Sequence, residues 1–167
     1  MSTKESNARD EGAAWVVETN GAEETRRLAA ALGRVAAPGD VIVLEGDLGA
    51  GKTTFVQGLA AGLGIPAPVN SPTFTLIKEY HGGRLPLFHI DVYRLGEGAE
   101  DLGFDEVFDA GGVAAIEWGH YAADYLPDEY LEIRLAKGEG DRRAVRVFPR
   151  GEAMRRRVEE WRAAWSS

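Results

Sequence analysis

The chain has 167 residues, 44% of them hydrophobic and 28% charged, which indicates one globular domain long enough to bury a core. It contains no cysteine, which excludes disulfides and thiolate metal sites, and its net charge of −8 disfavours nonspecific binding to nucleic acid. No apolar run approaches the ~20 residues of a membrane span, and the N-terminus lacks a signal-peptide pattern. We therefore expect a cytoplasmic protein that does not contact a membrane.

The charge is spread unevenly along the chain. From Arg142 onward there are eight arginines and three acidic residues, a net charge of +5, so that the first 141 residues carry −13. A basic segment of this kind is more often a solvated helix face than a binding surface. The alternative is a surface that meets phosphate groups or an acidic protein.

The first elements alternate between strand and helix. Residues 1–13 are polar and lack a hydrophobic period, which predicts a disordered tail ahead of a single domain over 14–167. Residues 15–19 (WVVET) predict a short strand. Asn20 is a candidate N-cap for a helix over 22–37, in which apolar residues recur at helical spacing and which ends at Pro38 and Gly39.

The next segment carries the strongest motif. The apolar run 41–44 (VIVL) is typical of a strand buried on both faces in a parallel sheet, and residues 53–64 predict a helix. Between them GDLGAGKTT matches G-x-x-x-x-G-K-[ST], a loop whose backbone N–H groups bind nucleotide phosphates, with Lys52 on the β- and γ-phosphates and the Thr53 hydroxyl on Mg²⁺. The predicted nucleotide contacts are Gly46, Asp47, Leu48, Gly49, Ala50, Gly51, Lys52, Thr53 and Thr54.

The second half predicts two hairpins and further core elements. Strands over 74–80 and 85–93 meet at Gly82-Gly83, and strands over 130–136 and 144–148 meet at KGEGD. The acidic segment between these hairpins predicts short helices, followed by a buried strand over 113–118. The last residues predict an amphipathic helix over 152–165, whose apolar stripe is expected to pack on the sheet and consists of Met154, Val158, Trp161 and Trp165.

Two carboxylates end apolar runs and are candidates for the metal and the attacking water. Asp91 follows PLFHI and Glu117 follows VAAI. Either side chain could bind Mg²⁺, directly or through water, while the other orients the nucleophile. The alternative for each is an ordinary ion pair, for example with Arg94. With Lys52, these two residues form the predicted catalytic set.

Other polar and aromatic residues allow two interpretations each. The loop SPTFT (71–75), with Thr73, could cover the γ-phosphate or simply lead into a strand. His89 lies two residues before Asp91 and on the same strand face, but the histidines lack zinc-ligand spacing, so we expect no metal cluster. Trp118 is expected on the opposite strand face from Glu117, either in the core or lining the site or a partner surface.

Two motifs that are absent from the sequence limit which nucleotide the loop is expected to bind. No N-K-x-D motif occurs, since none of the four lysines follows an asparagine, and this argues against an ordinary GTPase. No LSGGQ-like signature occurs, which argues against a transporter ATPase. ATP is therefore the expected nucleotide.

Four motifs occur in an order and at a spacing that resemble the bacterial TsaE (YjeE) family of small ATPases. They are GDLGAGKTT (46–54), NSPTFTL (70–76), HIDVYRL (89–95) and IEW (116–118), and the acidic segment EDLGFDEVF (100–108) is similar as well. The phosphate loop alone matches many families, whereas the series of four is specific. The likeness covers about residues 15–135 and not the basic C-terminal part.

The resemblance implies a role in forming N6-threonylcarbamoyladenosine at position 37 of tRNAs that read codons beginning with A. In that family the protein binds a TsaB–TsaD heterodimer, and ATP hydrolysis supports turnover of the complex, so contact with tRNA is expected to be indirect. The matching positions imply Lys52 on the phosphates, Thr53 and Glu117 on Mg²⁺, Asp91 in hydrolysis and Thr25 near the adenine. The family often has proline after EW, where this chain has Gly119, which leaves the shape of that loop open.

The sequence thus predicts a three-layer α/β P-loop fold with a mixed, mainly parallel sheet and antiparallel hairpins. The predicted activity is ATP hydrolysis with Mg²⁺, weak without partners because no arginine finger is identifiable. Two other functions stay open. A small-molecule kinase would transfer phosphate to a metabolite without protein partners, and a nucleotide-gated binding module would barely hydrolyse ATP.

Overall fold

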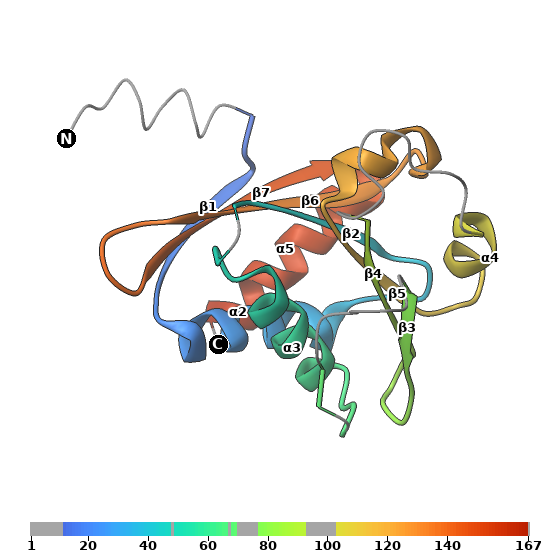
Figure 1. The fold of residues 1–167 in the computed structure, drawn as a ribbon, viewed down its shortest axis with the longest axis horizontal. Coiled ribbons are helices and arrows are strands. Elements are labelled where there is room, and N and C mark those ends of the chain that lie inside the picture. The colour runs from blue at the N-terminus through green and yellow to red at the C-terminus, as the bar shows by residue number, and fades with distance from the viewer. Residues whose placement is uncertain (1–11, 48, 67, 70–76, 93–102, 167) are drawn as a thin grey trace.

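Seven strands form one sheet in the computed structural model of the chain, which describes residues 12–47, 49–66, 68–69, 77–92 and 103–166 (Figure 1). In chain order the elements are β1 (Trp15–Asn20), α2 (Ala22–Val35), β2 (Val41–Glu45), α3 (Lys52–Gly62), β3 (Ile77–Tyr80), β4 (Leu87–Asp91), α4 (Phe104–Phe108), β5 (Val113–Glu117), the 3-10 helix η2 (Gly119–Tyr125), β6 (Tyr130–Lys137), β7 (Arg142–Arg150) and α5 (Glu152–Ser166). The strand order across the sheet is β1-β7-β6-β2-β5-β4-β3.

The centre of the sheet is parallel and its margins are antiparallel. β2 pairs in parallel with β5 and β6, and β5 pairs in parallel with β4. The pairs β1–β7, β6–β7 and β3–β4 are antiparallel. The predicted α/β fold with a mixed sheet and hairpins is confirmed. Of the first predicted hairpin, residues 74–76 and 93 lie outside the described residues, as does the tail 1–11.

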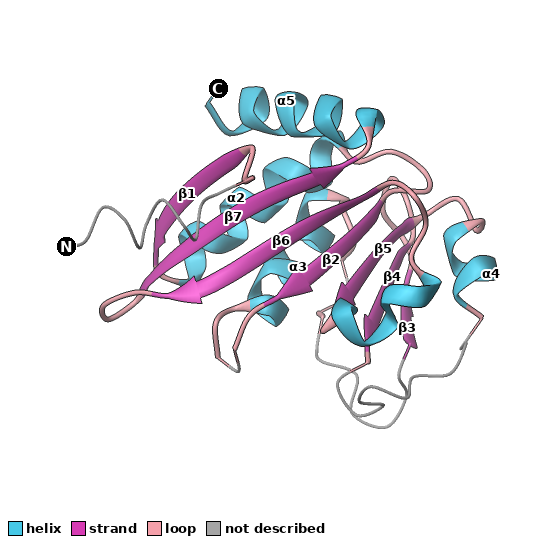
Figure 2. Cartoon of the chain, turned by 90° about the horizontal axis from the view of Figure 1, so that it is seen from above, coloured by secondary structure: helices cyan, strands magenta, loops and turns pink. Residues whose placement is uncertain are grey.

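Helices cover the two faces of the sheet unequally (Figure 2). α2, α3 and α5 lie on one face and bury the larger apolar core, whereas α4 and η2 lie on the other face over a smaller core. In the described part of the chain, no helix covers β1 and β7 on that second face. None of the described helices is long and apolar enough to cross a membrane.

The start of α2 differs from the prediction. Asn20 is the last residue of β1, where it pairs with Arg142, and is not the N-cap. Gly21 is the N-cap, with φ at 106° and no side-chain hydrogen bond to the helix. The chain must turn sharply between the strand and the helix, and glycine adopts this positive φ without a steric penalty.

Glycines bring α2 and α3 into close contact. A Cβ atom on Gly58 would lie 2.3 Å from the carbonyl oxygen of Arg26, and one on Gly62 would lie 2.2 Å from that of Ala30. On the other helix, a Cβ on Gly33 would lie 2.4 Å from the carbonyl oxygen of Leu59. The backbones therefore pack against each other directly. Because α3 begins at the phosphate loop, this contact fixes the direction in which the helix leaves the loop.

The C-terminal helix packs on both α2 and the sheet. Met154, Val158 and Trp161 of the predicted stripe are buried. Trp161 is 0% exposed, and its indole N–H donates to the carbonyl of Leu28 at 2.9 Å. Its ring also meets Trp15 of β1 edge-on, with centroids 5.1 Å apart. The stripe is thus part of the core, as predicted.

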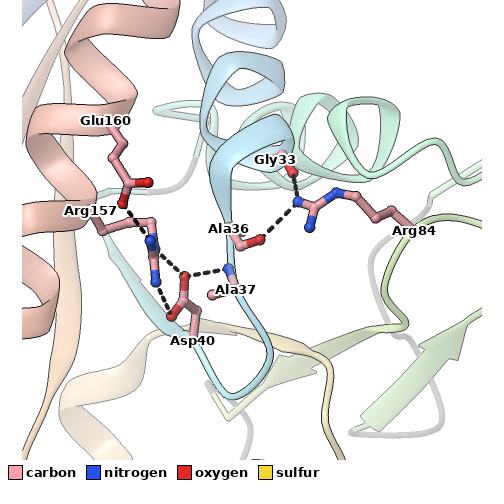
Figure 3. Close-up of polar contacts among 7 residues, drawn as sticks. All are labelled: Gly33, Ala36, Ala37, Asp40, Arg84, Arg157 and Glu160. Carbon is pink, nitrogen blue, oxygen red and sulfur yellow. Dashed lines mark hydrogen bonds and ion pairs between the residues drawn. The ribbon is translucent and has the colours of Figure 1, made fainter.

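Polar side chains fasten the end of α2 (Figure 3). Asp40 accepts a hydrogen bond from the backbone N–H of Ala37 at 2.9 Å and one from Arg157 Nε of α5 at 2.7 Å. Arg84, from the turn between β3 and β4, donates to the last carbonyls of the helix, those of Gly33 and Ala36, at 2.7 and 2.8 Å. Unpaired helix carbonyls are thereby satisfied by a residue distant in sequence.

The close contact of Gly58 with α2 predicts that replacing this helical glycine by alanine destabilises the protein. In an exposed helix position, alanine is more stable than glycine by about 1 kcal/mol. We expect Gly58→Ala to lower the free energy of unfolding instead, by roughly 1–3 kcal/mol, because the new methyl group overpacks the interface with α2. Urea denaturation measures the change. Ala61→Gly, on the exposed side of the same helix, is the control and should cost only the propensity difference; unchanged or greater stability of Gly58→Ala would contradict the packing argument.

Candidate functional site

The predicted site residues converge at one edge of the sheet. In the parallel ladder Leu44 of β2 lies beside Glu117 of β5, and Glu117 lies beside Asp91 of β4. The carboxyl ends of parallel strands meet at the same edge, which is where α/β sheets bind ligands. The loop that follows β2 begins at this edge with Gly46. The strand pairing therefore brings the phosphate loop and both candidate carboxylates together.

The loop has the backbone that phosphate binding requires. Gly46, Gly49 and Gly51 have φ values of 148°, 81° and 106°. A Cβ on Gly46 would lie 2.4 Å from the carbonyl oxygen of Leu135, so only glycine fits there. Gly51 is the N-cap of α3, whose first N–H groups point out of the helix and, with the helix dipole, favour an anion.

Lys52 forms hydrogen bonds with carbonyl oxygens of its own loop. Its Nζ donates to the carbonyls of Gly46 at 2.5 Å and Asp47 at 3.1 Å, and lies 4.0 Å from the ring centroid of Trp118. The residue is only 5% exposed. Carbonyl oxygens and the aromatic face thus stabilise a cation that water barely reaches.

Burial lowers the pKa of Lys52, and the negative charges of Glu117, Glu45, Asp91 and Asp47 oppose that change. The folded chain holds this proton less tightly than the unfolded chain does. The charged form therefore costs folding free energy below the folded-state pKa, and the cost fades as the pH rises toward 10.5. Phosphate groups beside Lys52 would favour its charged form.

A chain of hydrogen bonds connects α3 to β5 and β4. The Thr53 hydroxyl donates to Glu117 Oε2 at 3.2 Å, and His89 Nε2 lies 2.5 Å from the same oxygen. Since a carboxylate only accepts, His89 Nε2 carries the proton in this contact. His89 is 0% exposed, and its Nδ1 has no hydrogen-bond partner among the described residues. The carboxylate of Glu117 is thus oriented from two sides.

The oxygen atoms at this edge fit Mg²⁺ bound together with a triphosphate. The Thr53 hydroxyl and the Glu117 carboxylate face each other beside the loop, and Asp91 ends the next strand. Within the described residues, no group of three His, Cys, Asp or Glu side chains is placed to bind a metal ion. Mg²⁺ needs no such cage, because it is usually held by one or two protein oxygens plus phosphates and water.

The other residues that were predicted to contact the nucleotide lie in several parts of the fold. Thr54 lies in the first turn of α3, and Ala50 is buried in the core beneath the loop. Thr25 lies in the first turn of α2 and is 1% exposed, with its hydroxyl bonded to Thr19 Oγ1 at 2.7 Å. Its contact with adenine stays a prediction. Leu48 and Thr73, with the SPTFT loop and Arg94, lie outside the described residues.

The role of His89 was not predicted from the sequence. The two-residue spacing from Asp91 already put His89 on the face of the site, but only zinc binding was considered for it. Trp118 packs against the smaller core, on the face opposite Glu117 as expected. It lies just beyond β5, which ends at Glu117, and has φ at 62° and ψ at 39°, which strand alternation does not predict. This left-handed conformation turns its ring over Lys52, so Trp118 lines the site.

Similarity to known proteins identifies the family of the chain. The family model "Threonylcarbamoyl adenosine biosynthesis protein TsaE" matches residues 19–145. The chain belongs to the TsaE family. The match includes every residue of the site described above and ends within β7. It assigns the chain to tRNA threonylcarbamoyladenosine biosynthesis.

Individual relatives agree with this family. The chain is 54% identical over 123 residues to the tRNA threonylcarbamoyladenosine biosynthesis protein TsaE of Bacillus subtilis, which covers 74% of this chain and 78% of that protein. It is 47% identical over 133 residues to the TsaE protein of Nostoc sp., covering 76% and 81%. The crystal structure of Bacillus subtilis YdiB superimposes with a TM-score of 0.77 at 41% identity, over 89% of this chain and 94% of that one.

In this TsaE member the residue after Glu117 and Trp118 is Gly119, which packs closely on β2. Gly119 begins η2, and a Cβ there would lie 2.3 Å from Val43 Cγ1. The next residue, His120, donates its backbone N–H to Glu45 Oε1 at 2.8 Å. A glycine lets this turn pack closely on β2, so the segment after Trp118 is held against the strand that leads into the phosphate loop.

The buried bond from His89 predicts a metal-dependent effect. His89→Leu removes the donor to Glu117, whereas His89→Gln retains an N–H that can reach the same oxygen. We expect His89→Leu to weaken the Mg²⁺-dependent part of ATP binding about tenfold, as loss of a partner that orients a metal ligand does, and His89→Gln to keep most of it. Calorimetric titration with ATP at several Mg²⁺ concentrations measures this. Equal losses in both variants, or a loss that persists without Mg²⁺, would show that His89 only supports the fold.

Proposed function

We propose that the chain is the Mg²⁺-dependent ATPase subunit that supports N6-threonylcarbamoylation of adenosine 37 in tRNAs reading codons that begin with A. It would act in the cytoplasm on a TsaB–TsaD heterodimer and meet tRNA indirectly through that complex. The observation that carries the proposal is the Thr53 hydroxyl bonded to the Glu117 carboxylate beside a glycine loop that presents helix N–H groups. Membership of the TsaE family supports the pathway.

Each residue has a chemical task in this proposal. Lys52 leaves the carbonyls of Gly46 and Asp47 and neutralises charge on the β- and γ-phosphates. The loop N–H groups would bind phosphate oxygens, and Thr53 and Glu117 would hold Mg²⁺, which would neutralise charge on the phosphates. Asp91, at the next strand end, orients the attacking water and accepts its proton.

The binding partners of Lys52 support weak hydrolysis by the chain alone. Its Nζ contacts two carbonyls and an aromatic face, and a triphosphate that binds Lys52 would have to replace these interactions. A partner that shifts the segment around Trp118 would make this exchange easier. This reasoning favours a subunit whose turnover depends on other proteins.

The test compares carboxylate variants in the assembled complex. We expect Asp91→Asn and Glu117→Gln to lower the ATP hydrolysis rate with TsaB–TsaD by about 10²-fold or more, since general-base and charge-stabilising groups contribute on that scale. Glu139→Gln in the exposed β6–β7 turn makes the same chemical change away from the site and should not alter the rate. Product analysis by phosphate release and by tRNA nucleoside composition gives both readouts.

Three results would contradict the proposal. Hydrolysis unchanged in both variants would remove Asp91 and Glu117 from the reaction. Phosphate transfer to a metabolite without TsaB–TsaD would favour a small-molecule kinase. Binding to TsaB–TsaD that follows the nucleotide state, without measurable hydrolysis, would favour the nucleotide-gated module.

A further inference from the structure

One face of the sheet carries part of the basic segment that begins at Arg142, for which the proposed function gives no role. Along β7 the arginines at 142, 146 and 150 alternate with Val145 and Val147, which are buried against the helices. These arginines therefore lie on the opposite face, together with Phe148. We call this surface, formed by Glu132, Arg134, Arg142, Arg146, Phe148 and Arg150, the open face. Of the eight arginines from Arg142 onward, three lie on this face and four lie on α5.

The open face has a charge opposite to that of the chain. It carries four arginines. The glutamates on the same side of the sheet are Glu18 of β1, Glu45 of β2 and Glu132, which forms ion pairs with Arg134 and Arg150. The surface is still net positive, whereas the whole chain has a net charge of −8. The guanidinium of Arg134 lies 4.3 Å from the ring centroid of Phe148, and that of Arg150 lies 6.0 Å from it. Val16 of β1, also on this face, is 41% exposed. Arginine stacked on an aromatic ring is typical of protein interfaces.

A pocket adjoins the open face. It has a volume of about 350 Å³ and lies between η2, β2 and β6. Ala123, Leu126 and Tyr130 give it an apolar lining, and Glu45 and Glu132 add carboxylates. The glutamate side chains are 17% and 13% exposed, whereas the side chains bonded to them, His120 and Arg134, are 52% and 50% exposed. The carboxylates thus lie deep, and the histidine and the arginine lie at the rim.

Four consecutive residues connect this pocket to the nucleotide site. Glu117 accepts from Thr53, and the ring of Trp118 covers Lys52. Gly119 packs on Val43, and His120 at the pocket binds Glu45, with Nδ1 2.5 Å from Oε2. Glu45 directly precedes the phosphate loop. A contact at the pocket rim therefore acts on both sides of the phosphate loop: on Glu45, which precedes the loop, and on Lys52 and Thr53, which follow its glycines.

We propose that the open face and the η2 pocket form the docking surface for a protein partner that presents carboxylates to the arginines and an apolar side chain to the pocket. Docking acts on the nucleotide site through the segment 117–120. This inference rests on the proposed function, in which the chain works with TsaB–TsaD, and adds which surface of the chain is bound.

The apolar pocket beside the arginines favours protein over RNA as the occupant. A phosphate backbone is negative along its whole length and has no group that fits the apolar lining of Ala123, Leu126 and Tyr130 in the pocket beside the arginines. A protein surface can place carboxylates against Arg142 and Arg146 and an uncharged side chain in the adjacent pocket. The combination of arginines and an apolar pocket matches only the second kind of partner.

The experiment measures binding of the full chain to the TsaB–TsaD heterodimer by calorimetry with Mg²⁺ and ATP. Arg146→Glu reverses a charge on the open face, and Ala123→Trp fills the pocket from an exposed position on η2. We expect each to weaken binding at least about tenfold, the scale of a central interface residue. Arg155→Glu and Ala163→Trp, exposed on α5, make the same changes across the sheet and should bind like the wild type. ATP affinity of each isolated variant verifies that the nucleotide site is intact.

Coupling is tested with a variant at the pocket rim. Docking of the heterodimer should change the ATP affinity of the wild-type chain, and nucleotide should change docking by the same factor. His120→Ala removes the side-chain contact with Glu45 and should abolish that factor, whereas His120→Asn retains a short side-chain donor and should preserve part of it. A factor unchanged in His120→Ala would contradict the route through 117–120.

The outcomes separate the inference from the proposed function. If the wild type and both surface variants bind TsaB–TsaD equally, the docking surface is wrong and the proposed function stands. If the wild type does not bind at all, the proposed function fails and the inference fails with it. Binding of tRNA alone, or self-association of the chain, that is lost in Arg146→Glu while TsaB–TsaD binding persists would assign the face to RNA or to a second copy and overturn the inference.

Discussion

The parallel pairing of β2, β5 and β4 is the constraint on which the site depends. It sets Leu44, Glu117 and Asp91 side by side, so that the loop after β2 starts next to two carboxylates from distant parts of the chain. A one-residue slip of β5 would turn Glu117 to the other face of the sheet, away from Thr53. Direct backbone contact between α2 and α3 then fixes the helix that carries Lys52 and Thr53.

Most polar groups of the site bond to one another, although Nδ1 of the buried His89 has no hydrogen-bond partner among the described residues. Lys52 binds loop carbonyls, Thr53 binds Glu117, and His89 binds the same carboxylate from the far side. Unsatisfied buried polar groups are costly, so these hydrogen bonds stabilise the fold. In the proposed function, nucleotide and metal would replace some of these hydrogen bonds, which would be a physical basis for weak activity without a partner.

Much of the fold and of the site was predictable from local patterns. The apolar runs of β2 and β5, the glycine loop and the hairpins gave the sheet its predicted mixed character, and strand-end carboxylates pointed to Asp91 and Glu117. Two features depended on tertiary contacts that no local pattern encodes. The left-handed turn at Trp118 precedes the close packing of Gly119 on Val43, and the role of His89 requires the register of β4 with β5. The N-cap at Gly21 was missed because the turn's positive φ outweighed the preference for asparagine.

The central claim is that this edge of the sheet binds Mg²⁺ and ATP by exchanging its internal bonds. A crystal structure with Mg²⁺ and a non-hydrolysable ATP analogue tests it most directly. The account predicts Lys52 Nζ on the β- and γ-phosphates and released from Gly46 and Asp47, with Thr53 and Glu117 facing the metal and His89 still bound to Glu117. Nucleotide bound elsewhere, with Lys52 on the loop carbonyls and the Thr53–Glu117 bond intact, would contradict it.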